Sequence, residues 1–317
     1  MTNSAHLQVR VQAMRHEADG IVSIELVSPQ GDDLPAFAAG AHIDLHLPNG
    51  VVRSYSLWSA PQERRRYVIG VLRDRNSRGG SRYVHEQLRV GSTITIGAPR
   101  NNFPLDETAA RSVLVAGGIG ITPIFGMLNE LRRLGRPATL LYCARSRKEA
   151  AFVEQLAGSE GVTLHFDEEA GAPPDLRGYL ASQPADAHFY CCGPTPMLNA
   201  FEAQCAELGL ANVHLERFAP AEPVTAMQGS DYECLLAHSQ KVVLVPAGKS
   251  LLDALLEAGA DVDHSCREGV CGSCETAVLD GVPDHRDGVL SKAERESGKT
   301  MMVCVSGCKG RRLVLDL

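Results

Sequence analysis

The first third of the chain alternates short β-forming runs with turn residues such as Pro48-Asn49-Gly50. All of these runs fall between Leu7 and about Asp106. They are Leu7 to Met14, Ile21 to Val27, His42 to Leu47, Tyr67 to Leu72 and Thr93 to Ile96. Five or six strands at this spacing predict a small antiparallel barrel.

A second pattern begins at Arg111, where a continuous apolar run, Ser112 to Ala116, leads directly into Gly117-Gly118-Ile119-Gly120. Helical and strand-like stretches alternate after it. The expected helices are 124–134 and 150–156, and the expected strands are 139–143, 162–166 and 188–192. This alternation predicts a doubly wound parallel sheet over about Thr108 to Phe218.

The segment Ala219 to Ser230 contains two prolines and no periodicity, which indicates a linker. Strand-like runs at 232–236 and 241–246 follow it. A helix then begins after Ser250 as N-cap, with Asp253 three residues later and Gly259 as its stop. We therefore predict a multidomain β, α/β and α+β chain. Its expected parts are a barrel at 1–107, a nucleotide-binding domain at 108–219, a linker at 220–230 and a third domain at 231–317.

Composition narrows the functional class. The 317 residues are 44% hydrophobic and 22% charged, with 31 Lys and Arg against 38 Asp and Glu, so we expect a folded protein that does not bind nucleic acid. The chain has no apolar stretch long enough for a signal peptide or a membrane span, so we expect a cytoplasmic protein without a membrane partner. In a reducing compartment, its ten cysteines indicate metal or redox chemistry rather than disulfides.

Four cysteines carry the strongest chemical signal. Cys266, Cys271 and Cys274 follow the C-x4-C-x2-C spacing, and 29 residues separate Cys274 from Cys304, as in plant-type 2Fe-2S clusters. Small residues between them let the backbone turn its N–H groups toward the sulfur atoms. A structural zinc site is the alternative, because the last two cysteines alone fit zinc. We expect Cys308 to be a bystander.

From Tyr232 to Leu317 the chain resembles a plant-type ferredoxin domain, with the β-grasp-like fold that this implies. With a barrel and a nucleotide-binding domain ahead of it, the whole chain resembles the phthalate dioxygenase reductase family. That family includes the reductases of vanillate-type O-demethylases and carnitine monooxygenase. The resemblance implies a flavin-binding barrel.

Arg53-Ser54-Tyr55-Ser56-Leu57, which we place between barrel strands, matches the R-x-Y-S-L motif of the ferredoxin reductase superfamily. Tyr55 can lie against a flavin ring, Ser56 can bond near flavin N5, and Arg53 can neutralise a phosphate. A plain strand is the alternative. Gly79-Gly80-Ser81 opens an expected helix, 82–88, and in the family the equivalent segment holds the FMN phosphate. No adenine-binding insertion follows, so FMN is preferred over FAD.

The glycine run continues as Gly117-Gly118-Ile119-Gly120-Ile121-Thr122-Pro123 and departs from G-x-G-x-x-G at Pro123. A tight structural turn is the alternative. The run resembles the G-G-I-G-I-T-P turn of the family, which implies nicotinamide-nucleotide binding by Gly118 and Gly120, with Thr122 also near the flavin.

Two further motifs complete the resemblance. Cys192-Gly193-Pro194 ends an expected strand and resembles the C-G-P motif, which implies that Cys192 and Gly193 bind beside the nicotinamide, while Cys191 belongs to the core. Phe218, in Glu216-Arg217-Phe218, matches the aromatic residue that stacks on the flavin in relatives.

The sequence gives a weaker indication of whether the chain prefers NADH or NADPH. The acid that recognises the ribose in dinucleotide folds is missing, and Ala144-Arg145-Ser146-Arg147-Lys148 stands there instead. These cations could hold a 2′-phosphate or could simply be a solvated helix start. Relatives mostly use NADH, so NADH is preferred over NADPH.

The three cofactors together predict a converter of electron number, in which NADH delivers a hydride to FMN and the 2Fe-2S centre receives single electrons. We expect Ser56 and Phe218 to act at the flavin and Cys192 to act beside the nicotinamide. By resemblance, the partner is a Rieske-type oxygenase that acts on an aromatic acid or a small quaternary amine. A redox-sensing iron–sulfur protein and a reductase for another one-electron acceptor are the alternatives.

Overall fold

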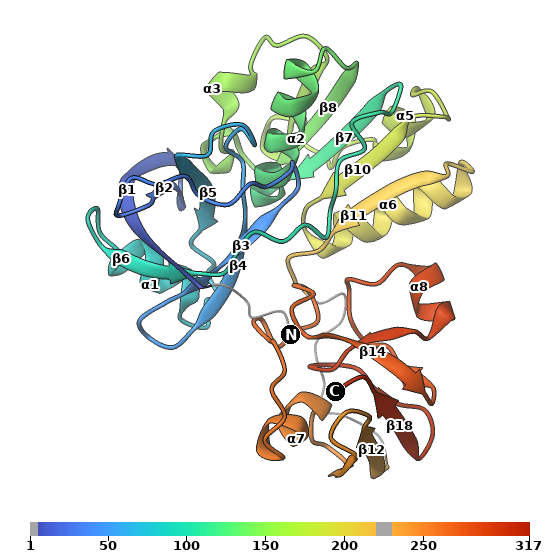
Figure 1. Ribbon diagram of the computed structural model, residues 1–317. Coiled ribbons are helices and arrows are strands. Elements are labelled where there is room, and N and C mark those ends of the chain that lie inside the picture. Colours follow the sequence, from blue (N-terminus) through green and yellow to red (C-terminus); the bar gives the residue numbers. More distant parts are fainter. Residues whose placement is uncertain (1–5, 220–229) are drawn as a thin grey trace. The chain divides into compact units, whose positions relative to one another are not determined.

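The computed structural model describes residues 6–219 and 230–317 and divides into two compact units, Met1–Glu216 and Arg217–Leu317 (Figure 1). The predicted linker, 220–230, lies outside the described residues apart from Ser230. The predicted boundary near residue 107 falls between the two sheets of the first unit, and the division into three domains stays a prediction. No helix among the described residues is both long and apolar enough to cross a membrane.

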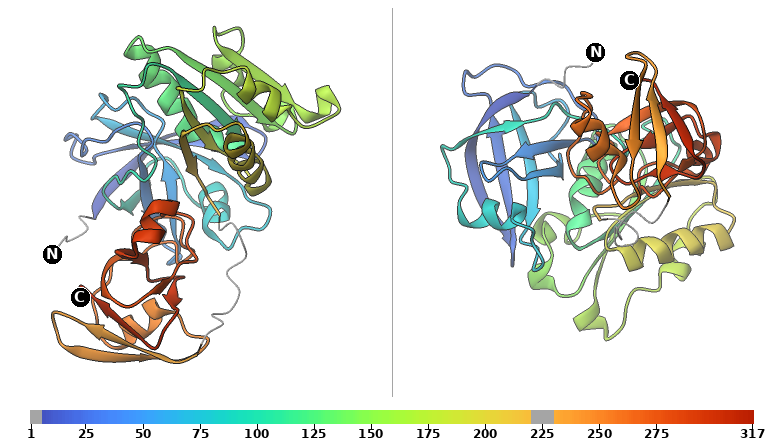
Figure 2. Two further views of the ribbon diagram at one scale, coloured as in Figure 1. Left: turned by 90° about the vertical axis from the view of Figure 1, so that its right-hand side faces the viewer. Right: turned by 90° about the horizontal axis from the view of Figure 1, so that it is seen from below.

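The first sheet of the first unit is antiparallel and confirms the predicted barrel (Figures 1 and 2). Its order is β4-β3-β6-β1-β2-β5. The chain beyond β4 closes it, because Leu57 bridges Ile69 and the Trp58 N–H donates to the Val68 carbonyl at 3.0 Å. The strands are β1 (Leu7–Ala18), β2 (Ile21–Val27), β3 (His42–His46), β4 (Val52–Ser56), β5 (Arg66–Leu72) and β6 (Thr93–Ile96), with helix α1 (Gly80–Glu86) between the last two.

One expectation for the barrel was wrong. The R-x-Y-S-L motif does not lie between strands but mostly on strand β4, which pairs with β3 through a hairpin whose turn ends at Gly50. Arg53 and Ser54 interrupt the apolar alternation, so the pattern alone does not indicate a strand there. Helix α1 also begins earlier than expected, at Gly80.

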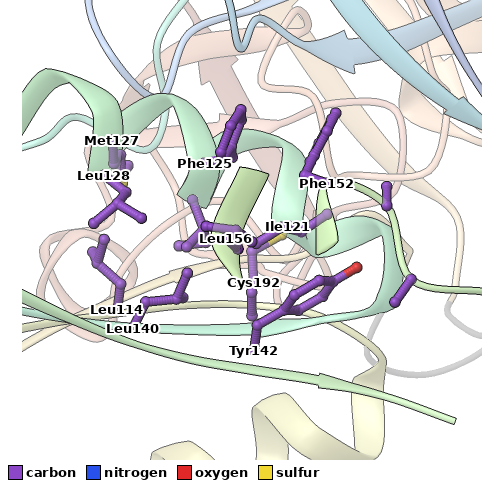
Figure 3. Packing of buried hydrophobic residues seen from close by; sticks show 14 of the residues in the cluster. Leu114, Ile121, Phe125, Met127, Leu128, Leu140, Tyr142, Phe152, Leu156 and Cys192 are labelled. Atoms are coloured by element: carbon purple, nitrogen blue, oxygen red, sulfur yellow. The ribbon is translucent and has the colours of Figure 1, made fainter. Parts of the chain in front are cut away.

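The second sheet is parallel, in the order β11-β10-β7-β8-β9, and confirms the doubly wound prediction. Apolar clusters cover both of its faces: α2 and α3 pack on one and α5 and α6 on the other. Figure 3 shows the first cluster, where Phe125 and Phe152 lie above Tyr142 and Cys192. Its strands are β7 (Ser112–Gly117), β8 (Ala138–Ala144), β9 (Val162–Phe166), β10 (His188–Cys192) and β11 (Asn212–Glu216).

The helices of this region differ from expectation in detail. Helix α2 (Ile121–Arg133) begins three residues earlier than expected. Helix α3 (Val153–Leu156) is shorter than the predicted 150–156, because Ala150 is extended and Phe152 has a positive φ of 63°. The remaining elements are the short helices η1 (Gly118–Gly120), η2 (Arg147–Glu149) and α4 (Asp167–Ala170), together with α5 (Leu176–Ala181) and α6 (Thr195–Glu207).

The second unit has a mixed five-stranded sheet, β13-β12-β18-β14-β16, in which β12 and β18 run parallel. Helix α7 (Leu251–Glu257) packs on it, and the predicted N-cap is confirmed: the Asp253 N–H donates to the Ser250 hydroxyl at 3.0 Å. The strands are β12 (Tyr232–Leu236), β13 (Lys241–Val245), β14 (Glu275–Asp280), β15 (Pro283–Asp284), β16 (Thr300–Met302), β17 (Gly307–Cys308) and β18 (Arg312–Leu315), with α8 (Lys292–Ser297) before β16.

Candidate functional site

The four predicted cluster cysteines meet in the second unit as two thiol pairs. The Cys266 thiol donates to Cys271, and the Cys304 thiol donates to Cys274. These bonds lower the pKa of Cys271 to about 5 and also lower that of Cys274, while they raise the pKa of both donors. Each pair therefore brings two cysteine sulfur atoms within hydrogen-bond distance of each other.

The loop that carries three of these cysteines is held by its backbone. The N–H of Glu268 donates to Cys266 Sγ at 3.3 Å, and the N–H of Cys266 points at Cys271 Sγ at 3.5 Å. Gly269 has a φ of 69°, and a Cβ there would lie 2.5 Å from Val305 Cγ2. Only glycine lets the loop come this close to the segment that delivers the fourth cysteine.

The arrangement fits a binuclear cluster better than a zinc ion. Each iron of a 2Fe-2S centre takes two cysteine sulfurs, which matches two pairs, whereas structural zinc takes one tetrahedral set. Cys308 lies outside both pairs, where its thiol bonds the Arg312 carbonyl at 3.5 Å.

In the first unit, the R-x-Y-S-L motif contacts the predicted phosphate segment. A Cβ on Gly80 would lie 2.7 Å from Arg53 Cγ, so the guanidinium-bearing side chain crosses directly over the start of α1. Gly79, which precedes the helix, has a φ of 102°. The Ser81 hydroxyl is already used within this loop, since it accepts from the Asp74 N–H at 3.2 Å.

Ser54, Tyr55 and Ser56 of the same motif have different surroundings. Ser54 donates to Asp44 at 2.6 Å, and Arg100 also binds that carboxylate, so the Ser54 hydroxyl is committed to the barrel. Tyr55 is largely desolvated, which raises the pKa of its phenol to about 12. Ser56 is 3% exposed, and among the described residues its buried hydroxyl makes no hydrogen bond of ordinary geometry, although it lies near enough to Glu216 to interact with that carboxyl. A buried hydroxyl without a well-formed hydrogen bond is what a ligand atom such as flavin N5 would satisfy.

The glycine turn after β7 is packed against the turn after β10. A Cβ on Gly120 would lie 2.2 Å from the Cys192 carbonyl oxygen, and one on Gly193 would lie 3.1 Å from Gly117 Cα. These glycines are therefore required for contact between the two turns. Gly118 differs, because it has a φ of 52° and faces open space, as a residue next to a bound phosphate would. The Thr122 hydroxyl bonds the Ile119 carbonyl at 3.0 Å.

The structure adds one residue that the sequence analysis did not select. Glu216 is the register partner of Cys192 on the neighbouring parallel strand, and Cys192 Sγ lies 4.0 Å from Glu216 Oε2. Desolvation raises the pKa of Glu216 to about 8. Interaction of its carboxyl with the Ser56 hydroxyl acts in the opposite direction and lowers this pKa. Burial also raises the pKa of the Cys192 thiol well above its usual value. Because Asn212 and His214 are also polar, the sequence of β11 carries no signal that singles out Glu216.

The first unit thus brings three of these polar groups together: the Ser56 hydroxyl, the Cys192 thiol and the Glu216 carboxyl. Phe218 belongs to the second unit, and its side chain is 42% exposed. It is not part of the constellation formed within the first unit.

Comparisons with known proteins agree with both sites. Residues 236–309 match the model of the 2Fe-2S iron-sulfur cluster binding domain. The chain is 51% identical, over 99% of its length and 98% of the relative, to the phenoxybenzoate dioxygenase subunit beta of Ectopseudomonas oleovorans. It is 38% identical, with a TM-score of 0.73 over 99% of this chain and 98% of the other, to phthalate dioxygenase reductase. The chain belongs to the phthalate dioxygenase reductase family.

As a member of this family, the chain is an oxidoreductase with a flavin- and nicotinamide-binding portion and a 2Fe-2S ferredoxin domain. The family bears out a 2Fe-2S cluster, a flavin and a nicotinamide nucleotide as its cofactors, while FMN over FAD and NADH over NADPH stay predictions. The chain is also 39% identical, with a TM-score of 0.90, to part of an intact type IV self-sufficient cytochrome P450 monooxygenase, and it spans 41% of that protein.

Proposed function

We propose that this chain is the NADH-dependent reductase of a Rieske-type non-haem iron oxygenase system. The observation that carries the proposal is the presence, in one chain, of two thiol pairs and of a separate constellation of Ser56, Cys192 and Glu216. The relative named phenoxybenzoate dioxygenase subunit beta supports an oxygenase as partner. Its name also favours an aromatic acid over a small quaternary amine as the substrate of that oxygenase.

We assign the flavin site to the barrel. Arg53 would neutralise the phosphate of FMN above the start of α1, with the backbone of Gly79, Gly80 and Ser81 around it. Tyr55 would lie along the flavin ring, and Ser56 would bond its N5 edge. Since the Ser54 hydroxyl is bound to Asp44, any contact from Ser54 would come from its backbone.

We assign the nicotinamide site to the turns after β7 and β10. Gly118, Gly120, Thr122 and Gly193 would line it, with Gly118 as the residue whose surroundings are open. Cys192 would hold the reacting ring in place with a neutral thiol, because burial keeps it protonated. Phe218 is the residue proposed to cover the flavin.

A bound FMN would supply the chemistry that links a two-electron hydride donor to the one-electron 2Fe-2S centre. The protein contributes orientation and proton control. Glu216, with a pKa of about 8, is mostly protonated at neutral pH and can hold or release a proton at Oε2 beside Cys192. The thiolates of Cys266, Cys271, Cys274 and Cys304 would ligate the cluster.

The test separates flavin reduction from onward electron transfer. In Cys274→Ser, FMN should still be reduced by NADH, because the two sites lie in different units, while cytochrome c reduction and support of a purified oxygenase should fall at least tenfold. Cys308→Ser is the matched control and should keep iron and both activities. Undiminished oxygenase turnover by the Cys274 variant would refute the proposed electron path.

A second candidate acceptor is the haem of a cytochrome P450, since the fold recurs within a self-sufficient P450. The two partners are distinguished by titrating each purified acceptor against the NADH-reduced protein. A Rieske oxygenase should be reduced at a rate that saturates with its concentration, whereas a P450 should be reduced slowly and without saturation.

A further inference from the structure

The carboxyl ends of β7 and β8 lie at the same edge of the parallel sheet. The two strands pair in parallel, with Gly117 of the glycine turn opposite Cys143 of β8, so the residues after Ala144 leave the sheet beside that turn. In dinucleotide-binding folds, side chains at this position distinguish a ribose 2′-hydroxyl from a 2′-phosphate. The coenzyme preference of this chain should therefore depend on residues 145–148 and on what they contact.

Arg147, one of the three cations there, is held by a carboxylate. Its Nε and Nη2 donate to the two oxygens of Glu169 at 3.0 and 3.2 Å, a bidentate geometry that fixes the guanidinium plane. The same guanidinium lies 4.4 Å from the centre of the Phe166 ring. The guanidinium of Arg147 thus donates two of its N–H groups to Glu169 and packs one of its faces on the Phe166 ring.

Glu169 is placed by the next strand. Strand β9 pairs with β8, with Phe166 opposite Ala144, and α4 follows β9 immediately. The Glu168 N–H donates to the Arg145 carbonyl at 3.0 Å and ties α4 to the segment after β8. The backbone that carries Glu169 is therefore a fixed part of this edge.

We propose that Glu169 makes the chain select NADH, by holding Arg147 away from the position of a 2′-phosphate and by repelling that phosphate. The inference rests on the proposed nicotinamide function. A 2′-hydroxyl is neutral and needs no cation, so the pair leaves NADH binding intact. A 2′-phosphate would have to break both hydrogen bonds to Arg147 and would meet the charge of Glu169.

The experiment measures binding of 5′-AMP and 2′,5′-ADP by calorimetry on the full-length flavin-loaded protein. Glu169→Gln should tighten 2′,5′-ADP by about tenfold, equivalent to about 1.4 kcal/mol, and should leave 5′-AMP within about twofold. The ratio of kcat/KM for NADPH to that for NADH should rise in parallel. In Glu169→Gln with Arg147→Ala, the gain should disappear.

Glu168→Gln is the matched control, because it removes the same charge from the adjacent exposed residue while the bidentate pair of Arg147 with Glu169 stays in place. An equal gain in this variant would show that general charge, not the Arg147 pair, sets the preference. No gain in Glu169→Gln, or a gain that survives removal of Arg147, would also overturn the inference. If the wild-type protein bound neither nucleotide, the proposed nucleotide site itself would fail.

Discussion

Replacing Glu216 by Gln should make the stability of the first unit less dependent on pH. Glu216 lies at the end of β11 beside Cys192, and desolvation raises its pKa from 4.5 to about 8. The neutral carboxyl is tolerated there, but the carboxylate is not. Gln has nearly the same shape and never ionises, so it keeps the packing and removes the charging penalty.

The direction and size of this pH effect on the free energy of unfolding follow from the difference between the folded and unfolded pKa of Glu216. Because the folded pKa is raised, the contribution of the neutral carboxyl is fully present below pH 4.5 and is lost as the pH rises toward 8. Each pKa unit corresponds to about 1.4 kcal/mol. Glu216 therefore lowers the free energy of unfolding of the wild-type protein by roughly 3 kcal/mol at pH 7 and by about 1 kcal/mol at pH 5, relative to a side chain that never ionises. Glu216 is partly accessible, so water relieves some of this, and we expect about 2 kcal/mol at pH 7.

Trp58 makes the measurement direct, because it is the only tryptophan of the chain and packs against Phe152 at 4.9 Å in the first unit. Urea unfolding followed by its fluorescence, with FMN in constant excess, should show Glu216→Gln more stable than wild type at pH 8 and nearly equal at pH 5. The exposed Glu154→Gln should shift neither midpoint. A stability difference between Glu216→Gln and wild type that is the same at both pH values would refute the reasoning.

Three further predictions test single contacts. Arg53→Ala should weaken FMN binding roughly ten- to a hundredfold in a fluorescence titration, from loss of about 1.5 to 3 kcal/mol in one charged contact, and Arg53→Lys should retain most of the affinity. Cys192→Ala should keep FMN but slow its reduction by NADH in stopped-flow absorbance; an unchanged rate would remove Cys192 from the nicotinamide site. Gly269→Ala should lower the iron content and the melting temperature, because its Cβ would lie 2.5 Å from a neighbouring side chain, whereas Gly310→Ala, with nothing closer than 3.9 Å, should change neither.

The parts of the molecule that the sequence predicted well are specified locally. The spacing of Cys266, Cys271 and Cys274 determines one loop, and the N-cap at Ser250 determines the start of one helix. The strands 162–166 and 188–192 were predicted at both ends. Strand β10 is an apolar run buried after its first residue, as expected inside a parallel sheet, whereas β9 lies at the edge of the sheet and alternates apolar with polar residues.

What the sequence did not reveal depends on pairing between distant segments. Glu216 becomes notable only because parallel register sets it opposite Cys192, and no periodicity within β11 contains that information. Strand β4 was missed for a related reason, since its polar residues are explained by partners elsewhere, such as Asp44 for Ser54. The contact between Arg147 and Glu169 likewise joins the ends of two strands.

The contact between the two turns has a consequence for how the nicotinamide site works. Because a single added carbon on Gly120 would collide with the Cys192 carbonyl, the backbone of the glycine turn and that of the Cys192 turn are in direct contact. A displacement of one turn must therefore displace the other. The groups proposed to receive the pyrophosphate and the nicotinamide ring are consequently packed together, so a nucleotide bound at Gly118 would meet Cys192 already in place. Strand pairing likewise places Glu216 beside Cys192, with its Oε2 atom 4.0 Å from the thiol.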